Sequence, residues 1–256
     1  MKAELRARFR HSAPAVAPEQ LQRDFYAATA DRYDQMHVHA DDEHYVALSF
    51  ISAMVDGYGY GQILDVGAGT GRGVKHLIDK HPAVEVAGVE PVRAMIDTAE
   101  RINGVPAGVI VEAGGDPLPY SDRSFDAVCE LGILHHVSDP NAIVSEMTRV
   151  ARRAVFLSDG NRFAGGGGAH RAAKYALYML RLWPAVYRAA TGGRGYALNQ
   201  GDGGVAYSYS VYDSLQILNE WADRVFLVPT TAARTSWFHP LFSARTVLLC
   251  AIRDQH

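Results

Sequence analysis

A short apolar run that ends in three alternating glycines most constrains what this chain can fold into. The run Ile63–Val66 is followed by Gly67, Gly69 and Gly71, and then by a helical pattern in VKHLIDK. Glycines at these positions permit a tight turn and a close approach of the backbone to a ligand, and the next helix presents its N-terminal N–H groups. The segment therefore predicts a ligand-binding strand–turn–helix unit, with an ordinary strand-to-helix turn as the alternative.

Strand and helix patterns continue to alternate after this turn. Four further strands are predicted at Val84–Val89, Val109–Val111, Phe125–Glu130 and Ala154–Leu157. Helical patterns at Pro91–Ile102 and 141–150 lie between them. Such alternation indicates right-handed βαβ units around a parallel sheet, so we predict an α/β fold.

The alternation of strand and helix patterns is interrupted on both sides of this core. The first twenty residues lack periodicity and predict a loose tail; one helix is then expected from Leu21 to Tyr33 and another around Tyr45–Met54. After Ser158 come glycine clusters and an aromatic, cationic segment, and the α/β pattern returns at Ser214. We expect a tail and helical cap over residues 1–60, a core over 61–158, an inserted lid over 159–212, and a return to the core sheet over 213–256.

Composition narrows the classes of function. The 256 residues include 25 Lys and Arg against 28 Asp and Glu, which gives a formal net charge of -3. The chain therefore lacks the overall positive charge expected of a dedicated nucleic-acid binder. Cys129 and Cys250 lie in apolar runs, and no Cys or His spacing suits a metal. No apolar stretch approaches the roughly 18 residues of a membrane span, and the N-terminus lacks a secretory apolar region. We expect a soluble, cytoplasmic protein without a metal.

Charged residues near the glycine turn discriminate among ligands. Arg72 stands where a dinucleotide fingerprint would have its third glycine. Asp65, two residues before the first glycine, would repel a pyrophosphate but not a positively charged ligand. Glu90, at the end of the second predicted strand, is placed to accept the hydroxyls of a ribose. The alternative for Glu90 is a solvated side chain ahead of a helix that starts at Pro91.

The motifs ILDVGAGTGRG, GVEP and LPYSDRSFDAVCELGILHHVSDP together resemble those of class I S-adenosylmethionine-dependent methyltransferases. The similarity is to the small-molecule group that includes the ubiquinone- and menaquinone-biosynthesis type, over roughly residues 21–158. It implies a Rossmann-like, mostly parallel seven-stranded sheet and S-adenosylmethionine as cofactor. The motifs are specific for the cofactor and say little about the methyl acceptor.

The resemblance also implies which residues bind the cofactor. Glu90 matches the ribose acid, Glu130 and Leu131 match the place where the methionine amino group is held, and Tyr33 resembles a residue that closes over the carboxylate. The matching positions are Tyr33, Asp65, Gly67, Gly69, Gly71, Glu90, Pro91, Glu130 and Leu131.

The adenine segment departs from the family pattern. The usual Gly-Asp pair falls here on Ala113 and Gly114, and an acid appears at Asp116 instead. Asp116 is therefore the expected contact for the adenine amine.

Two histidines follow the fourth predicted strand. A neutral imidazole at His135 or His136 is placed to take a proton from an oxygen or nitrogen nucleophile. In some related enzymes a matching His works with an N-terminal Tyr, which here would be Tyr26 or Tyr33. The alternatives are a histidine bonded to the backbone and a mechanism of proximity alone, without a base.

The expected lid carries a cationic helical stripe and many aromatic residues. The stripe consists of Arg171, Lys174, Tyr178, Arg181 and Arg188. It fits peripheral contact with a membrane through residues 171–188, an anionic or lipid-like substrate, or a solvated lid face. The aromatic residues either line an apolar pocket or pack the lid onto the sheet, and they include Trp183, Tyr187, Tyr207, Tyr209, Tyr212, Trp237, Phe238 and His239.

These observations predict methyl transfer from S-adenosylmethionine to a small, partly hydrophobic acceptor, at oxygen or nitrogen. One alternative is a nucleotide-dependent oxidoreductase, against which the D-x-G-x-G-x-G order counts. Another is a cofactor-binding regulator without turnover. We expect no nucleic-acid partner and no integral membrane contact; the acceptor and the oligomeric state stay open.

Overall fold

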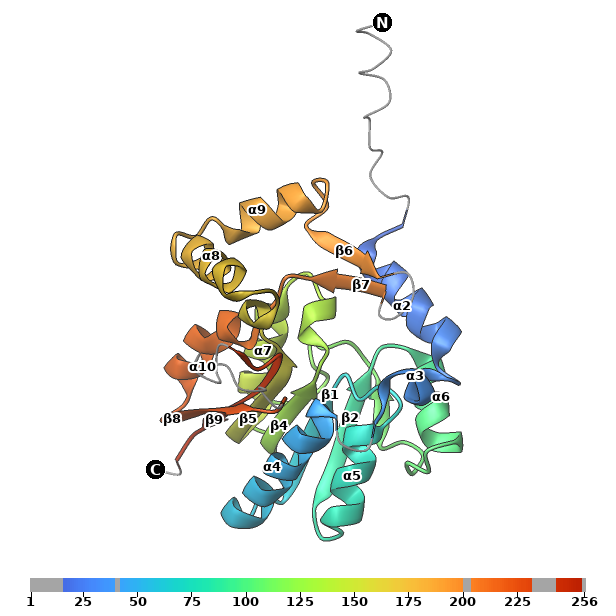
Figure 1. Cartoon of the computed structure of the whole chain (residues 1–256). Helices are drawn as coiled ribbons and strands as arrows, with labels where there is room; N and C mark the ends of the chain where they lie inside the picture. Colours follow the sequence, from blue (N-terminus) through green and yellow to red (C-terminus); the bar gives the residue numbers. More distant parts are fainter. Residues whose placement is uncertain (1–15, 40–41, 200–203, 232–242, 255–256) are drawn as a thin grey trace, which may run out of the picture.

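The strands of the central sheet run almost all in one direction. They are β1 (Gln62–Val66), β2 (Glu85–Glu90), β3 (Ile110–Glu112), β4 (Phe125–Leu131), β5 (Ala151–Gly160), β8 (Arg224–Pro229) and β9 (Thr246–Ile252). The computed structural model describes residues 16–39, 42–199, 204–231 and 243–254, and the sheet order within them is β3-β2-β1-β4-β5-β9-β8 (Figure 1). β1 to β5 pair in parallel, and β9 is antiparallel to both neighbours. The predicted Rossmann-like, mostly parallel seven-stranded sheet is confirmed.

Helices cover both faces of the sheet and form two hydrophobic cores. On one face lie α4 (Glu43–Tyr58), α5 (Arg72–Lys80) and α6 (Arg93–Arg101), and on the other α7 (Pro140–Val150) and α10 (Leu215–Trp221). Because both faces are covered, the central strands are buried and apolar along most of their length. Polar groups that leave the sheet therefore gather at the carboxyl ends of the strands.

The described residues before β1 form three helices, where the sequence predicted two. They are α2 (Pro18–Thr29), α3 (Tyr33–His37) and α4. The helix predicted to run as far as Tyr33 instead ends at Thr29, and Arg32 takes a non-helical φ of -121° and ψ of 2°. α2 begins at Pro18, where the helical pattern of the sequence begins, near the end of the twenty residues predicted as a tail; residues 1–15 lie outside the described ranges.

Asp34 explains why α3 separates from α2. Its carboxylate accepts hydrogen bonds from the Thr70 hydroxyl at 2.5 Å and from the Asn103 amide nitrogen at 2.6 Å. Asp42, which caps α4, forms a bidentate ion pair with Arg72 at 2.6 and 2.7 Å. The two carboxylates hold the N-terminal helices against the glycine turn, and these bonds outweigh the continuity of a single helix.

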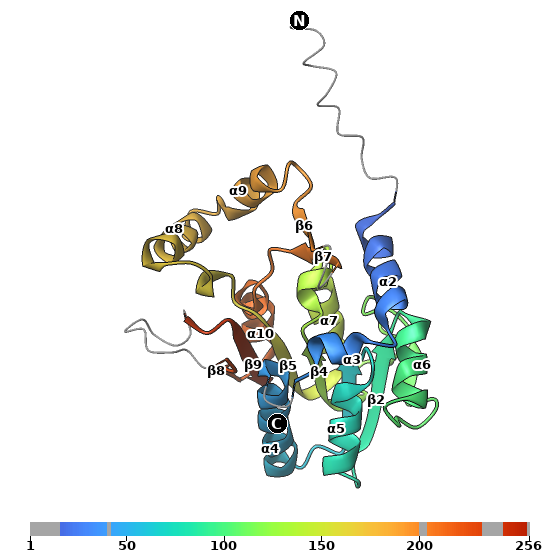
Figure 2. The ribbon, with the colours of Figure 1, turned by 45° about the vertical axis from the view of Figure 1, so that its right-hand side comes forward.

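After β5 the chain leaves the sheet and forms a layer above its carboxyl edge. This layer contains η2 (Arg162–Ala164), α8 (Gly168–Met179), α9 (Trp183–Ala190), the hairpin β6 (Tyr196–Asn199) and β7 (Gly204–Tyr207), and η3 (Val211–Ser214). Figure 2 shows α8 and α9 standing away from the sheet, with β7 next to α2. Trp237, Phe238 and His239, predicted as pocket or packing residues, lie outside the described residues.

The backbone N–H and carbonyl of Val205 link this layer to the rest of the molecule. The Val205 N–H donates to Gln22 Oε1 of α2 at 2.5 Å, and the Val205 carbonyl accepts from His136 Nδ1 at 2.6 Å. β7 is thereby fixed between the N-terminal helices and the segment that follows β4.

Gly71, the third glycine of the turn, serves packing. It begins α5 with φ +80°, and a Cβ there would lie 2.6 Å from Val105 Cγ2 and 2.9 Å from Ala99 Cβ. This glycine therefore allows the turn to lie against the end of α6.

We predict that Gly71→Ala destabilises the protein by about 2–4 kcal/mol, because a positive φ and a steric overlap add. Gly108 is the matched control, since its φ is +81° and nothing lies within 4 Å of the position that a Cβ would take there. Gly108→Ala should cost only the backbone term, about 1–2 kcal/mol. Urea unfolding measures both variants, and equal losses would contradict the packing role.

Candidate active site

A cavity of about 430 Å³ opens at the carboxyl ends of β1, β2 and β4, between the glycine turn and the N-terminal helices. The parallel sheet brings these strand ends together, which is where ligands bind in folds of this kind. The predicted residues that line it are Tyr33, Asp65, Gly67, Gly69, Glu90, Leu131, His135 and His136.

A second cavity, of about 330 Å³, adjoins the first and shares with it Tyr26, Gly67, Glu90, Ile133 and His136. The predicted residues Pro91 and Asp116 line only this second cavity, together with residues 113–115. Glu90 lies at the junction, so the pair of cavities forms one elongated cleft that bends around its carboxylate.

Two predicted cofactor residues do not line the cleft. Gly71 packs against Val105 and Ala99. Glu130 is fully buried beneath the cleft, where its Oε2 accepts from the Ile133 N–H at 3.1 Å. Its Oε1 has no hydrogen-bond partner within the described part of the chain, and burial raises its pKa well above the ordinary value.

The Glu90 carboxylate is held in one orientation by the backbone. Oε2 accepts from the Gly69 N–H and Oε1 from the Val92 N–H, both at 3.0 Å. Burial raises the pKa of Glu90 to about 7 even though both hydrogen bonds favour the charged form. Such a carboxylate is oriented for a polar ligand. Its charged form is stabilised by a ligand that donates hydrogen bonds to it.

Asp65 lies buried below the glycine turn. A Cβ at Gly73 would collide with its carboxylate, so the glycine following Arg72 makes room for this acid. Burial, with a smaller contribution from Glu90, raises the pKa of Asp65 to about 7. Together with Glu130, these acids make the floor of the cleft favourable for a cation.

His135 forms a dyad with Asp159, a residue the sequence did not single out. Its Nδ1 lies 2.8 Å from Asp159 Oδ1, and its backbone N–H donates to Oδ2 at 3.1 Å. Burial lowers the pKa of His135, but the Asp159 carboxylate outweighs it, so the pKa is raised above 6.5. The bond to Asp159 occupies Nδ1 and leaves Nε2 as the ring atom available to take a proton.

His136 is held differently. Its Nδ1 donates to the Val205 carbonyl, and its ring meets Tyr26 edge to face with centroids 5.8 Å apart. Burial, reinforced by His135, lowers its pKa to about 4, so the ring is neutral at pH 7. This is the backbone-bonded histidine that the sequence left as an alternative.

Tyr33 and Tyr26 close the cleft from the N-terminal side. Their rings meet edge to face at 5.8 Å. Burial raises the pKa of Tyr33 to about 12 and that of Tyr26 well above its ordinary value. Both hydroxyls therefore act as hydrogen-bond donors near pH 7.

His44 is a further site residue that the sequence analysis missed. It lines the cleft and approaches Gly132, where a Cβ would lie 2.9 Å from the His44 ring. Gly132 has φ +82°, a conformation that favours glycine. The glycine directly after the fourth predicted strand was the signal in the sequence that could have pointed to this part of the site.

Residues 64–157 match a family model described as a methyltransferase domain. The match covers the predicted core and agrees with the resemblance of the motifs to class I S-adenosylmethionine-dependent methyltransferases, and so with S-adenosylmethionine as the cofactor that the motifs imply.

Particular relatives agree with this class. The chain is 33% identical over 140 residues to a demethylmenaquinone methyltransferase of Deinococcus radiodurans, covering 52% of this chain and 56% of the relative. It is 28% identical to a ubiquinone/menaquinone biosynthesis C-methyltransferase of Desulfotalea psychrophila, covering 50% and 52%. The chain thus spans about half the length of these curated relatives.

A solved structure shows the same fold. The magnesium protoporphyrin IX methyltransferase of Synechocystis PCC 6803 with bound SAH has a TM-score of 0.56 at 18% identity, covering 93% of this chain and 100% of that chain. In the part of the chain that the structure describes, no helix is long and apolar enough to span a membrane.

The cleft fits the cofactor in shape and charge. A Cβ at Gly67 would lie 2.5 Å from Ile133 Cγ2, so only glycine keeps the backbone of the turn in this place. The buried acids suit a ligand with a sulfonium and an ammonium group, whose charge would offset the cost of ionising Asp65 and Glu90.

We predict that Asp65 and Glu90 each contribute stability to the ligand-free protein that is lost as pH rises from about 5 to 7.5. Asp65 and Glu90, with pKa values raised to about 7, bind protons in the folded state that the unfolded chain has already released. Each group contributes at most about 1.4 kcal/mol per pH unit.

Thermal unfolding across this pH range measures the effect. Asp65→Asn should flatten the slope, whereas Asp79→Asn, a change at an exposed carboxylate, should leave it unchanged. A slope equal in all three proteins would contradict the assignment.

Proposed function

We propose that this protein transfers a methyl group from S-adenosylmethionine to a small, partly hydrophobic acceptor at oxygen or nitrogen, with His135 as general base. The observation that carries the proposal is the His135–Asp159 dyad at the edge of the cleft. His135 lines both the cleft and a cavity of about 310 Å³ next to it. A base at this boundary is within reach of an acceptor that approaches the cofactor from the cavity of about 310 Å³.

The cofactor, when bound, supplies a methyl group on a good leaving group. Glu90 would hold its ribose hydroxyls, Tyr33 its carboxylate and Asp116 its adenine amine. Asp65 and Glu130 would complement its positive charge from below, Glu130 without lining the cleft. These assignments combine the predicted roles with positions around one continuous cleft.

His135 would remove the proton from the attacking oxygen or nitrogen. Asp159 would fix the tautomer of the ring and stabilise the imidazolium that forms. The same dyad would serve a carbon acid, so C-methylation is the second candidate; the name of the Desulfotalea relative favours it.

Cofactor binding is tested by calorimetric titration with S-adenosylhomocysteine, S-adenosylmethionine and NADH. We expect micromolar binding of both sulfur ligands, lost or weakened at least tenfold in Glu90→Ala. Glu112→Ala is the matched control, because Glu112 is exposed and pairs in register with Glu90 on β3. Binding of NADH alone would overturn the proposal in favour of an oxidoreductase.

The base is tested first by NMR titration of the imidazole rings. We expect the His135 pKa above 6.5, and a fall toward or below 6.5 in Asp159→Asn, because the carboxylate that favours the imidazolium is gone. His136 should stay neutral down to a pKa of about 4.

Methyl transfer from labelled S-adenosylmethionine to a panel of phenols and amines completes this test. The rate should fall on the acid side through the His135 pKa, and Asp159→Asn should move that limb to lower pH. His135→Gln should lower kcat by about 10²–10⁴-fold with cofactor affinity unchanged. A full rate in His135→Gln would exclude the base role, and cofactor binding without any product would favour a regulator.

A further inference from the structure

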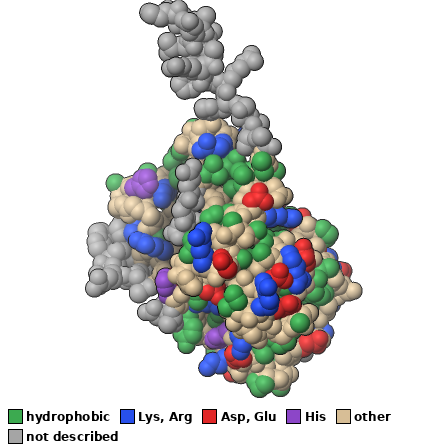
Figure 3. All heavy atoms as spheres, turned by 90° about the vertical axis from the view of Figure 1, so that its right-hand side faces the viewer, with side chains coloured by type: hydrophobic (Ala, Val, Ile, Leu, Met, Phe, Trp, Pro, Cys, Tyr) green, Lys and Arg blue, Asp and Glu red, His purple; other side chains and the backbone are tan. Residues whose placement is uncertain are grey.

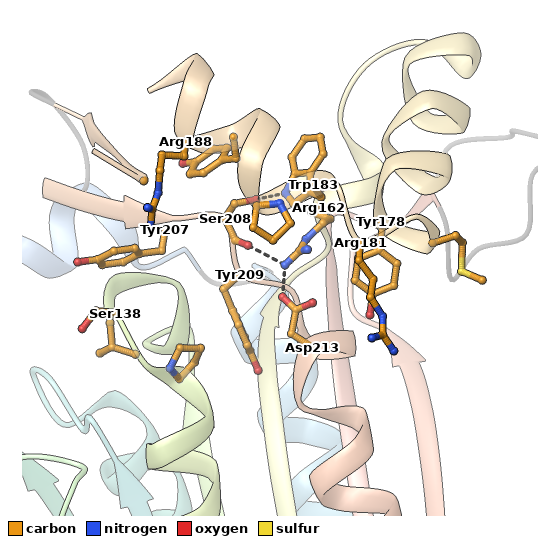
Figure 4. Close-up of a pocket in the computed structure, with 16 residues that line it drawn as sticks. Ser138, Arg162, Tyr178, Arg181, Trp183, Arg188, Tyr207, Ser208, Tyr209 and Asp213 are labelled. Carbon is orange, nitrogen blue, oxygen red and sulfur yellow. Dashed lines mark hydrogen bonds and ion pairs between the residues drawn. The ribbon is translucent and has the colours of Figure 1, made fainter. Parts of the chain in front are cut away.

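A further cavity lies in the layer above the sheet and outside the cofactor cleft. It has a volume of about 650 Å³ and is enclosed by α8, α9, β7 and the segment after β4 (Figure 4). Arg162 and Tyr209 line both this cavity and the 310 Å³ cavity that contains the His135–Asp159 dyad. The lid cavity and the cavity of the proposed base are therefore neighbours, with Arg162 and Tyr209 between them.

Aromatic rings form the walls of this cavity, and the polar atoms of three of them, Trp183, Tyr187 and Tyr209, are already bonded elsewhere. Trp183 Nε1 donates to the Ser208 hydroxyl at 2.8 Å, and the Tyr187 hydroxyl donates to the Ala206 carbonyl at 3.3 Å. The Tyr209 hydroxyl is bonded to Ser214. Because these tips are satisfied, the walls offer mainly ring surface to a ligand.

The cavity is also strongly cationic. Arg162, Arg181 and Arg188 line it, and Asp213 is the single acid among its lining residues. Arg162 already binds both Asp213 and the Ser208 carbonyl. The guanidinium groups of Arg181 and Arg188 have no hydrogen bond or ion pair with the described residues, and Figure 4 shows the two side chains on opposite sides of the cavity, Arg188 toward Tyr207 and Arg181 beside Tyr178.

The sequence of the lid reinforces this charge. Between Asp159 and Asp202 it has six Lys and Arg residues and no Asp or Glu, although the whole chain has a net charge of -3. On the side of the molecule in Figure 3, by contrast, basic and acidic side chains are interspersed. Among the residues that the structure describes, an anion in the lid cavity thus meets two unpaired guanidinium groups and no free carboxylate.

The two cavities differ in charge. The inner cavity is lined by side chains of both signs, Glu43 and Asp159 against Arg162 and Arg245, and Asp159 is paired with His135. At the outer end lie Arg181 and Arg188. An acceptor with an anionic group would be bound by the unpaired guanidinium groups at the outer end, which leaves its opposite end for His135.

We propose that the lid cavity binds a methyl acceptor with an aromatic body and an anionic group, which pairs with either Arg181 or Arg188, with its nucleophile directed inward. That the bound molecule is a methyl acceptor rests on the proposed function. The binding of aromatic anions in the lid cavity is tested without turnover. Carboxylate, sulfonate and phosphate share the required chemistry, because each accepts hydrogen bonds from guanidinium.

Two fluorescent probes separate charge from apolar binding in the full-length protein. 8-Anilinonaphthalene-1-sulfonate has the required aromatic body and anion, and N-phenyl-1-naphthylamine has the same rings without the anion. We expect Arg181→Gln/Arg188→Gln to weaken binding of the sulfonate at least tenfold and to leave the neutral probe within twofold.

The matched control is Arg171→Gln/Arg194→Gln, which removes two lid charges that do not line the cavity. It should leave both probes unchanged. Equal weakening in the two double variants, or none in either, would overturn the proposal. Pelleting with phosphatidylglycerol vesicles that depends on Arg181 and Arg188, without probe discrimination, would assign these residues to a lipid surface and also overturn it.

Parallel calorimetry with S-adenosylhomocysteine distinguishes the two proposals. Unchanged binding in Arg181→Gln/Arg188→Gln shows an intact cofactor cleft, so loss of the sulfonate then reports on the lid alone. If no form of the protein binds the sulfur ligand while the probes discriminate, the proposed function fails and the anion site stands.

Discussion

Four buried carboxylates, at the carboxyl ends of β1, β2, β4 and β5, are the constraint on which the site depends. They are Asp65, Glu90, Glu130 and Asp159. A parallel sheet brings these strand ends to one edge, so the acids share a small volume with little water. Each is accommodated differently: Glu90 by two backbone N–H groups, Asp159 by an imidazole, and Asp65 and Glu130 by raised pKa values that favour the neutral form.

The N-terminal helices cover these acids, so a ligand in the cleft would contact both. A cation in the cleft would lower the cost of ionising the acids, while Tyr26 and Tyr33 cover it from the N-terminal side. The cover is anchored by Asp34 on the glycine turn, and β7 is anchored on the cover through Val205. The Val205 carbonyl also binds His136 Nδ1 and fixes the orientation of that ring, which burial keeps neutral.

The features predicted from sequence are those that local pattern determines. The strand–turn–helix unit and the position of Glu90 follow from an apolar run, glycines and strand spacing. Asp159 escaped notice because β5 extends past its apolar run Ala154–Leu157, and its partner His135 is 24 residues away in sequence. Gly71 shares its spacing with Gly67 and Gly69, but only the neighbours supplied by α6 show that it serves packing.

Charge is separated along the cavities in a way that no single motif reveals. The core concentrates buried acids where the sheet ends, and the lid, free of acids from residue 160 to 201, concentrates arginines around aromatic rings. A cation is therefore stabilised at one end and an anion at the other. Because the dyad of His135 and Asp159 lies between them, a cationic methyl donor and an anionic acceptor would each be oriented by the field of its own end before any specific contact forms.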